Sequence, residues 1–300
     1  MTESHDLRDF LMSRRAQIDP TSTGLPVAAT ARRGKGLRRE EVAALAGVSV
    51  DYYARLEQGR IGNVSDQILT AIEDVLRLTA LERDHLRALV RTEPIRARKT
   101  APSAPRVRGS LRDLIVEMDP IPVILQGPRM EILAWNRAAT ILLTDFASMT
   151  QKDRNIARWL FLDPSTRTKY PDWEEVAAPT VAALRAARNP RRPDEALERL
   201  VGELSVASED FARFWAGYRL FKHGHGIKRI FHKTVGTMTL NYETFDIPDS
   251  GGQFFSIYTA DVGSPSAEKL QILLSWNQTL EGEHRSSSPA SATPSSTDEH

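Results

Sequence analysis

Hydrophobic residues recur at helical spacing through the first 90 positions of the chain. Leu7, Phe10, Leu11 and Ile18 fall on one side of the first such stretch. Similar patterns begin at Arg38, after Ser49, after Ser65 and after Thr79, and glycines or capping hydroxyl residues separate them. The pattern therefore predicts a compact all-α domain of five short helices.

The periodicity changes after residue 108. The segment LRDLIVEM, residues 111–118, predicts a helix, and two short apolar runs, PVILQG and MEILAWN, predict strands around a Gly-Pro turn. Residues 137–215 are mainly helical in pattern. Alternation at Met238, Leu240 and Tyr242 then predicts a half-buried strand, with a turn near Gly236 before it. A further strand, QFFSIYTA, and a terminal helix, SAEKLQILLSWN, complete this half.

These patterns define an α+β chain with two folded parts. We expect an N-terminal five-helix domain at 1–91, a proline-rich linker at 92–108 and a mixed helix and strand domain at 109–280. Residues 281–300 are rich in Ser, Pro and Thr, and we expect a disordered tail there.

Composition narrows the possible classes of protein. Hydrophobic residues make up 41% and charged residues 26% of the chain, which is typical of soluble domains. No apolar run reaches the roughly 20 residues of a membrane helix, and the N-terminus lacks a signal-peptide pattern, so we expect a cytoplasmic protein with no membrane partner. The absence of cysteine excludes disulfides and thiolate metal sites.

Residues 39–57 have the spacing of a helix-turn-helix. Ala43 is small where two helices would cross, Gly47 stands where the turn needs a positive φ, and Ser49 can cap the second helix. Five cations and no acid lie between Arg32 and Arg39. A helix-turn-helix with a basic flank is the arrangement that places a helix in the major groove of DNA. The alternative is an ordinary two-helix corner beside a solvated loop, which has the same pattern.

The outward positions of the second helix would contact base edges, and flanking polar residues would contact phosphates. The candidate base contacts are Val50, Asp51, Tyr52 and Arg55, and the candidates for phosphate or backbone contact are Arg38, Arg39, Ser49, Arg60 and Asn63. One such helix reads only a few base pairs, so we expect a homodimer on double-stranded DNA, with half-sites about 34 Å apart.

The segment resembles the helix-turn-helix of XRE-type (Cro/C1-like) regulators, including its ending Leu56-Glu57-Gln58-Gly59. That resemblance implies that Glu57 forms a buried ion pair with Arg14 or Arg15 of the first helix. Glu57 is then a structural residue and not a catalytic acid.

The longer phrase GLRREEVAALAGVSVDYYARLEQGR is similar to the MmyB-like subgroup of these regulators, and the similarity continues over about residues 7–276. Its later pieces are Ile132-Leu133-Ala134-Trp135-Asn136, Arg154-Asn155, Phe161-Leu162-Asp163-Pro164, Asp172-Trp173-Glu174, Phe214-Trp215-Ala216, His232-Lys233-Thr234-Val235-Gly236 and Tyr258-Thr259-Ala260. The chain departs from the subgroup at Val64, Tyr218 and the pair Lys233-Thr234.

The resemblance implies a PAS-like ligand-binding domain with an apolar pocket and an amphiphilic ligand such as a fatty acid. Such a pocket combines large apolar side chains with a few polar groups. The candidate ligand contacts are Trp135, Asn136, Asn155, Phe161, Trp173, Trp215, His223, His232 and Tyr258.

Other functions of the second domain stay open at this point. His223, His225 and His232 have a spacing that a metal site could use, but glycine and the lack of nearby acids favour a loop, and we expect no metal. No nucleophile elbow, phosphate-binding loop or HExxH motif is present, so we expect no enzyme and no cofactor. The alternatives are a protein-interaction module and an enzyme without a familiar motif.

Overall fold

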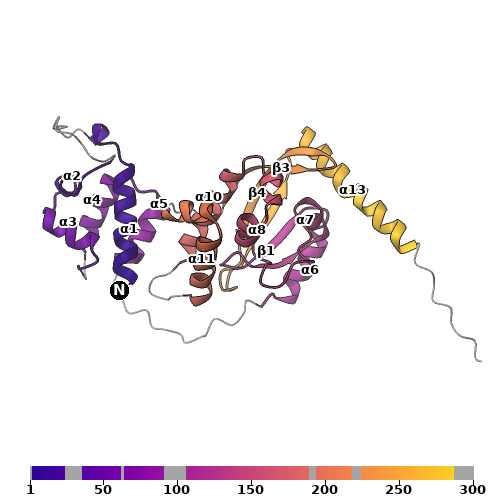
Figure 1. Ribbon diagram of the computed structural model, residues 1–300, viewed down its shortest axis with the longest axis horizontal. Helices are drawn as coiled ribbons and strands as arrows, with labels where there is room; N and C mark the ends of the chain where they lie inside the picture. The colour runs from indigo at the N-terminus through magenta and orange to yellow at the C-terminus, as the bar shows by residue number, and fades with distance from the viewer. Residues whose placement is uncertain are drawn as a thin grey trace, which may run out of the picture.

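The computed structural model describes residues 2–23, 36–61, 64–90, 106–188, 194–217 and 224–286, with side chains from residue 6 to residue 275. Within those ranges the chain forms an N-terminal helical part and a C-terminal part with a five-stranded sheet (Figure 1). The α+β class expected from the sequence is confirmed. The linker expected at 92–108 lies mostly outside the described residues.

Five helices and one 3-10 turn build the N-terminal part. They are α1 (Thr2–Gln17), η1 (Pro20–Thr23), α2 (Arg39–Leu45), α3 (Val50–Glu57), α4 (Asp66–Val75) and α5 (Ala80–Val90). Phe10 and Leu11 of α1 are fully buried against Val42, Tyr53 and Leu56 in one hydrophobic core. The apolar stripes seen in the sequence therefore converge as expected.

The predicted N-caps fix where these helices begin. The Ser49 hydroxyl accepts a hydrogen bond from the Tyr52 N–H at 3.1 Å, and Ser65 caps α4 in the same way. Thr79 and Glu82 exchange hydrogen bonds between side chain and backbone at the start of α5, which is a capping box. All three caps expected from the sequence are confirmed.

The C-terminal part is built on an antiparallel sheet in the order β2-β1-β5-β4-β3. The strands are β1 (Val123–Gln126), β2 (Ile132–Trp135), β3 (His225–His232), β4 (Gly236–Asp246) and β5 (Phe254–Thr259). The hairpin of β3 and β4 turns at Gly236, whose φ is 76°, as the sequence predicts.

The helices of this part cover both faces of the sheet or, like α11 and α12, pack on the helices that do. They are α6 (Gly109–Glu117), α7 (Arg137–Leu142), α8 (Ile156–Leu162), α9 (Ser165–Lys169), α10 (Trp173–Ala187), α11 (Glu195–Ala207), α12 (Glu209–Ala216) and α13 (Pro265–Ser286). Helix α6 packs on one face over Val123 and Phe255. Helices α7 to α10 and α13 pack on the other, over Ile230 and Leu240, and we call this the inner face.

Helix α13 is longer than the sequence pattern predicts. It continues to Ser286, as Figure 1 shows, and so includes the first residues of the stretch expected to be a tail from 281. Helix-forming residues such as Leu280, Glu281 and Glu283 extend it, and the first proline after its start stands only at Pro289. The remaining residues, 287–300, lie outside the described part.

The two parts contact each other through α1 and the helices α10 to α12. Arg188, directly after α10, forms ion pairs with Asp6 of α1 and Glu198 of α11. The Ser13 hydroxyl donates to the Gly217 carbonyl at 3.4 Å. Burial raises the pKa of Asp6, and the Arg188 guanidinium counters that shift. A buried acid and an arginine thus lie at the contact between the domains.

Candidate functional site

The turn between α2 and α3 has the geometry that the sequence predicts. Gly47 adopts a φ of 68°, and the Val48 N–H donates to the Ala43 carbonyl at 2.9 Å. Ala43 is fully buried where the helices cross. A small residue is needed there because a larger side chain would push the helices apart.

The outer side of α3 is open to solvent. Val50 is 44% exposed, and the side chains of Asp51 and Arg55 are 71% and 63% exposed. These two residues form an ion pair of 3.0 Å one helical turn apart. In Figure 1, α3 lies at the end of the molecule away from the sheet. The surface proposed for base contact is therefore not covered by the described residues.

The remaining candidate DNA contacts surround this face. Arg38, Ser49 and Arg60 are exposed, and Tyr52 is partly buried. The Ser49 side chain caps α3, and the Arg38 N–H donates to the Glu41 carboxylate at 2.7 Å in the cap of α2. Asn63 lies outside the described residues.

Glu57 has a partner that the sequence did not indicate. Its buried carboxylate accepts two hydrogen bonds from Arg39, at 3.0 Å from Nε and 3.2 Å from Nη2. Arg15 is an expected partner and lies 3.5 Å away, so that expectation is confirmed. Arg14, the other arginine that the resemblance offered, forms an ion pair with Glu82 of α5. Arg39, a candidate phosphate contact, thus also holds α2 against α3.

Two of the candidate ligand contacts are helix caps whose polar atoms are engaged. The Asn136 side chain accepts from the N–H groups of Ala139 and Val123 and donates to the Ile121 carbonyl at 2.6 Å. The Asn155 oxygen accepts from two N–H groups of α8, and its nitrogen donates to the Arg129 carbonyl at 2.8 Å. These bonds support a structural role for both amides.

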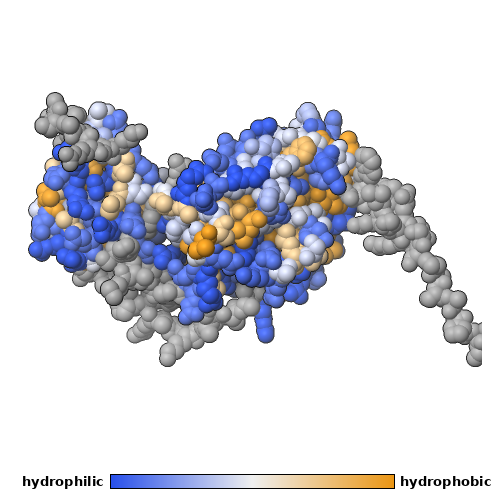
Figure 2. All heavy atoms as spheres, viewed as in Figure 1, coloured by the Kyte–Doolittle hydropathy of each residue, from blue (hydrophilic) through white to orange (hydrophobic). Residues whose placement is uncertain are grey.

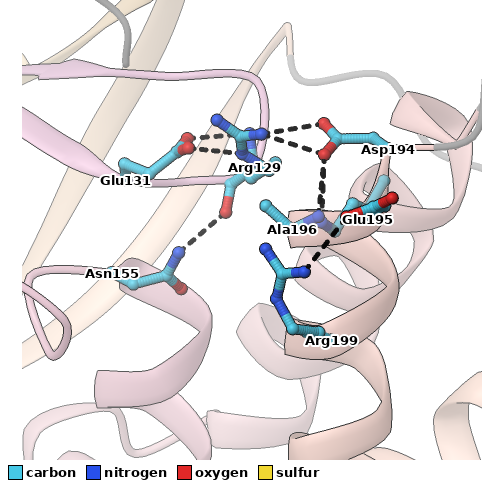
Figure 3. Close-up of polar contacts among 8 residues, drawn as sticks. Arg129, Glu131, Asn155, Asp194, Glu195, Ala196 and Arg199 are labelled. Atoms are coloured by element: carbon cyan, nitrogen blue, oxygen red, sulfur yellow. Dashed lines mark hydrogen bonds and ion pairs between the residues drawn. The ribbon is translucent and has the colours of Figure 1, made fainter. Parts of the chain in front are cut away.

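Asn155 belongs to a polar network that joins the sheet to the helical layer (Figure 3). Arg129, in the turn between β1 and β2, forms ion pairs with Glu131 and with Asp194, the N-cap of α11. The network fixes α11 relative to the hairpin, and α11 in turn holds Arg188 through Glu198. A series of ion pairs therefore connects the β1–β2 hairpin, α11 and the contact between the domains.

The predicted aromatic residues divide into two groups. Trp135, Trp173 and Tyr258 pack in the core cluster on the inner face of the sheet, and Phe161 packs against Trp173 with ring centroids 5.3 Å apart. Trp215 lies instead on α12, where its ring stacks on Phe211 at 5.8 Å. Trp215 lies outside the cluster on the inner face, and Phe161 connects the two groups because its ring also contacts Phe211, with centroids 5.1 Å apart.

Of the two histidines predicted as ligand contacts, His232 lies among the described residues. His232 lies at the end of β3, and its Nδ1 accepts a hydrogen bond from the Thr234 N–H at 3.2 Å. Burial, together with the nearby cations Lys169 and Lys233, lowers its pKa and so favours the neutral imidazole. His223 lies outside the described residues. Among the residues described, no three His, Asp or Glu side chains are placed to hold a metal ion.

The inner face also carries polar residues that the sequence analysis did not select. Lys228 of β3 places its Nζ 4.1 Å from the Tyr242 ring centroid and 5.5 Å from that of Tyr258. Burial lowers the pKa of Lys228 to about 8 and raises those of Tyr170 and Tyr258. The sequence contained one signal that could have identified Lys228. Side chains alternate between the two faces of a strand, so Lys228 lies on the same side of β3 as Ile230.

An apolar groove opens where α13 crosses the ends of β1 and β5. Its volume is about 410 Å³, and Ile121, Tyr258 and Leu270 are among its lining residues. In Figure 2, hydrophobic side chains gather on the visible face where α13 begins and also over α10 to α12. The groove falls within the range of small-molecule sites, which is about 300–1,000 Å³.

Comparisons with known proteins identify both parts of the chain. A family model described as "MmyB-like transcription regulator ligand binding domain" matches residues 107–273, and one described as "Helix-turn-helix domain" matches residues 27–86. No curated protein matches the sequence. No helix among the described residues is long and apolar enough to cross a membrane.

One solved structure similar to this chain is titled "Structure of an RNA-binding Light-Oxygen-Voltage Receptor". The identity is 10%, and the alignment covers 95% of this chain and 65% of that one, so this chain spans less than two thirds of its length. The TM-score is 0.24.

Proposed function

The chain belongs to the MmyB-like transcription regulators, whose ligand-binding domain covers more than half of its length, and on that premise we propose how it binds DNA and what it senses. Its helix-turn-helix domain and its ligand-binding domain make it a DNA-binding transcription regulator. We propose that it binds as a homodimer, reads bases with the outer face of α3 and responds to a small amphiphilic ligand.

The observation that carries the DNA proposal is the exposed face of α3. Arg55 is the residue on that face with the most hydrogen-bond donors, and Asp51 holds it in place one turn away. An arginine that donates two hydrogen bonds to a guanine discriminates by about 1–3 kcal/mol against the wrong base. Arg38 is exposed and lies at the N-cap of α2, not on the outer face of α3, so we assign it to a phosphate contact.

Replacing these two arginines tests the assignment. Loss of a base contact reduces sequence selectivity, whereas loss of a phosphate contact weakens binding to every sequence. We expect Arg55→Ala to bring the preferred site and its single-base variants close to the same affinity. We expect Arg38→Ala to weaken binding to all duplexes alike and to reduce the salt slope by about one. Anisotropy titrations at several salt concentrations measure both effects. Unchanged affinity and selectivity in both variants would reject this assignment.

The proposed route from ligand to DNA runs through the contact between the domains. Arg188 pairs with Asp6 of α1 and with Glu198 of α11, and α11 is tied to the β1–β2 hairpin through Asp194. A ligand changes DNA affinity only if it favours one arrangement of the domains over another. This contact is where we propose that the two arrangements differ.

We therefore expect Arg188→Ala to uncouple the two domains. The variant should still bind its operator, but with an affinity that saturating ligand no longer changes, and operator titrations with and without dodecanoate as the probe ligand measure this. Arg199→Ala is the matched control, because Arg199 also lies on α11 and forms an ion pair with Glu195 on the exposed surface of that same helix. A ligand response that is identical in wild type and Arg188→Ala contradicts the route.

A further inference from the structure

A histidine lies at the contact between the two domains. His85 is on α5, which faces α10 in Figure 1, and its ring packs against the ring of Phe10 of α1 with centroids 5.3 Å apart. His85 is partly buried, and its enclosed Nε2 atom has no hydrogen-bond partner among the described residues. An imidazolium donates from both ring nitrogens. Protonation would therefore leave a donor at Nε2 without an acceptor.

The charged groups around His85 oppose a further positive charge. Arg185 of α10 and Arg14 of α1 face it from the two neighbouring helices, and Glu82 of its own helix is the acid that faces it. Glu82 is already engaged, because its carboxylate pairs with Arg14 and accepts a hydrogen bond from the Thr79 N–H. The surroundings therefore favour the neutral imidazole.

Arg185 is held in this position by the ligand-binding domain. Its buried guanidinium lies 4.0 Å from the centroid of the Trp215 ring on α12, and it donates a hydrogen bond to the Trp215 carbonyl. Arginine keeps its proton in proteins, so these contacts place a permanent positive charge opposite His85. That charge belongs to the other domain, and it acts on His85 only while the two domains are in contact.

The proton affinity of His85 thus depends on whether the domains are in contact. Burial, followed by Arg185 and Arg14, lowers the pKa of His85 from its ordinary 6.5 to about 4. Separation of the domains would hydrate the imidazole and remove Arg185, so the pKa would rise toward the ordinary value. A group that binds its proton more tightly in the separated form favours separation as the pH falls.

We propose that protonation of His85 separates the helical domain from the ligand-binding domain, so that acidification weakens the contact between them. This inference goes beyond the proposed function and requires neither ligand nor DNA. Because the ligand response is proposed to use the same contact, pH and ligand would be two inputs to one equilibrium.

A second titratable group at the contact responds to pH with the opposite sign. Asp6 faces Arg188, Arg185 and Glu198, and burial raises the pKa of its carboxyl, so protonation of Asp6 favours the contact. Its ordinary value of 3.8 is far below that of histidine, and His85 therefore governs the range from pH 7.5 to 5.5. Over that range the equilibrium should shift toward separation by up to about tenfold.

Distances between two spin labels test this inference in the full chain. The sequence contains no cysteine, so Glu40→Cys on α2 and Asp113→Cys on α6 place one label at an exposed position of each domain. Double electron–electron resonance at pH 7.5 and pH 5.5 then gives the ratio of separated to contacting domains. We expect this ratio to rise severalfold, up to about tenfold, on acidification of the chain with His85 intact.

His85→Gln removes the titrating group and keeps a polar side chain, so its ratio should change less than twofold between the two pH values. His225→Gln is the matched control, because His225 is an exposed histidine at the start of β3, and it should respond as the parent does. Circular dichroism at both pH values separates domain release from unfolding. Titration of the imidazole resonances of the parent chain, assigned with His85→Gln, should place the pKa of His85 well below 6.5.

Four results would overturn the inference: an unchanged ratio in the parent chain, an equal pH response in His85→Gln, loss of helical signal at pH 5.5, or an ordinary pKa for His85. Ligand and DNA are absent from all of these measurements. Such a failure therefore leaves both the regulator function and the proposed ligand response untouched.

Discussion

Replacing Glu57 by alanine is expected to unfold the N-terminal domain under conditions in which wild type is folded. The Glu57 carboxylate is fully buried and accepts two hydrogen bonds from Arg39, with Arg15 at 3.5 Å. Removing one partner of a buried ion pair costs about 3–5 kcal/mol, since the remaining charge is left uncompensated. That is a large part of the roughly 5–15 kcal/mol that stabilise a typical domain.

Thermal unfolding followed by circular dichroism measures the Glu57→Ala effect, and operator binding should be lost in parallel. Glu40→Ala is the control, because Glu40 is an exposed glutamate on α2 and its removal should cost less than about 1 kcal/mol. A Glu57→Ala protein that unfolds at the wild-type temperature but fails to bind DNA would show that Glu57 acts directly at the operator.

Replacing Asn136 by alanine is expected to destabilise the ligand-binding domain by about 2–4 kcal/mol. Loss of the α7 cap costs about 1 kcal/mol. The change also leaves the buried Val123 N–H without its side-chain partner, and a buried polar group without a partner costs about 1–3 kcal/mol. This result would separate a structural asparagine from one that contacts ligand.

Urea unfolding monitored by tryptophan fluorescence measures the Asn136→Ala effect. Asn241→Ala serves as the control, because that asparagine donates to Asp261 on the exposed surface. We expect it to change stability by less than about 0.5 kcal/mol. If Asn136→Ala keeps the wild-type midpoint and loses dodecanoate binding, Asn136 is a ligand contact and the structural interpretation is wrong.

The helical domain could be predicted from sequence because its signals are local. The apolar periodicity, the positive φ at Gly47 and the caps at Ser49 and Ser65 each depend on residues within one or two turns. The strands of the second domain were predicted for the same reason, from alternation and from the turn at Gly236. Two helices went beyond their patterns: α1 begins at Thr2, before the predicted start at Leu7, and α13 continues to Ser286.

The pairing of side chains from distant parts of the chain could not be predicted in the same way. Arg39 and Glu57 are 18 positions apart, and the resemblance to XRE-type regulators pointed only to Arg14 or Arg15 of α1 as the partner of Glu57. Asn136 and Asn155 were predicted as ligand contacts because a ligand pocket combines apolar side chains with a few polar groups. A different local signal was available, because each stands directly before a helix and asparagine is a favoured N-cap.

Lys228 shows a further limit of sequence reasoning. Its position on the inner face follows from the period of β3, and β3 is an edge strand of the sheet, where lysines are common. What distinguishes it is the absence of a carboxylate among the described residues around its ammonium, and that depends on packing from β4 and β5. Three-dimensional contacts were needed to single it out.

Selection of duplexes from a random-sequence library by the purified full chain tests most directly whether the outer face of α3 reads DNA. We predict that wild type enriches one motif with two half-sites about 34 Å apart. A variant with alanine at Val50, Asp51 and Arg55 should remain folded and lose that motif. Enrichment of the same motif by this variant, or no enrichment by wild type, would contradict the account.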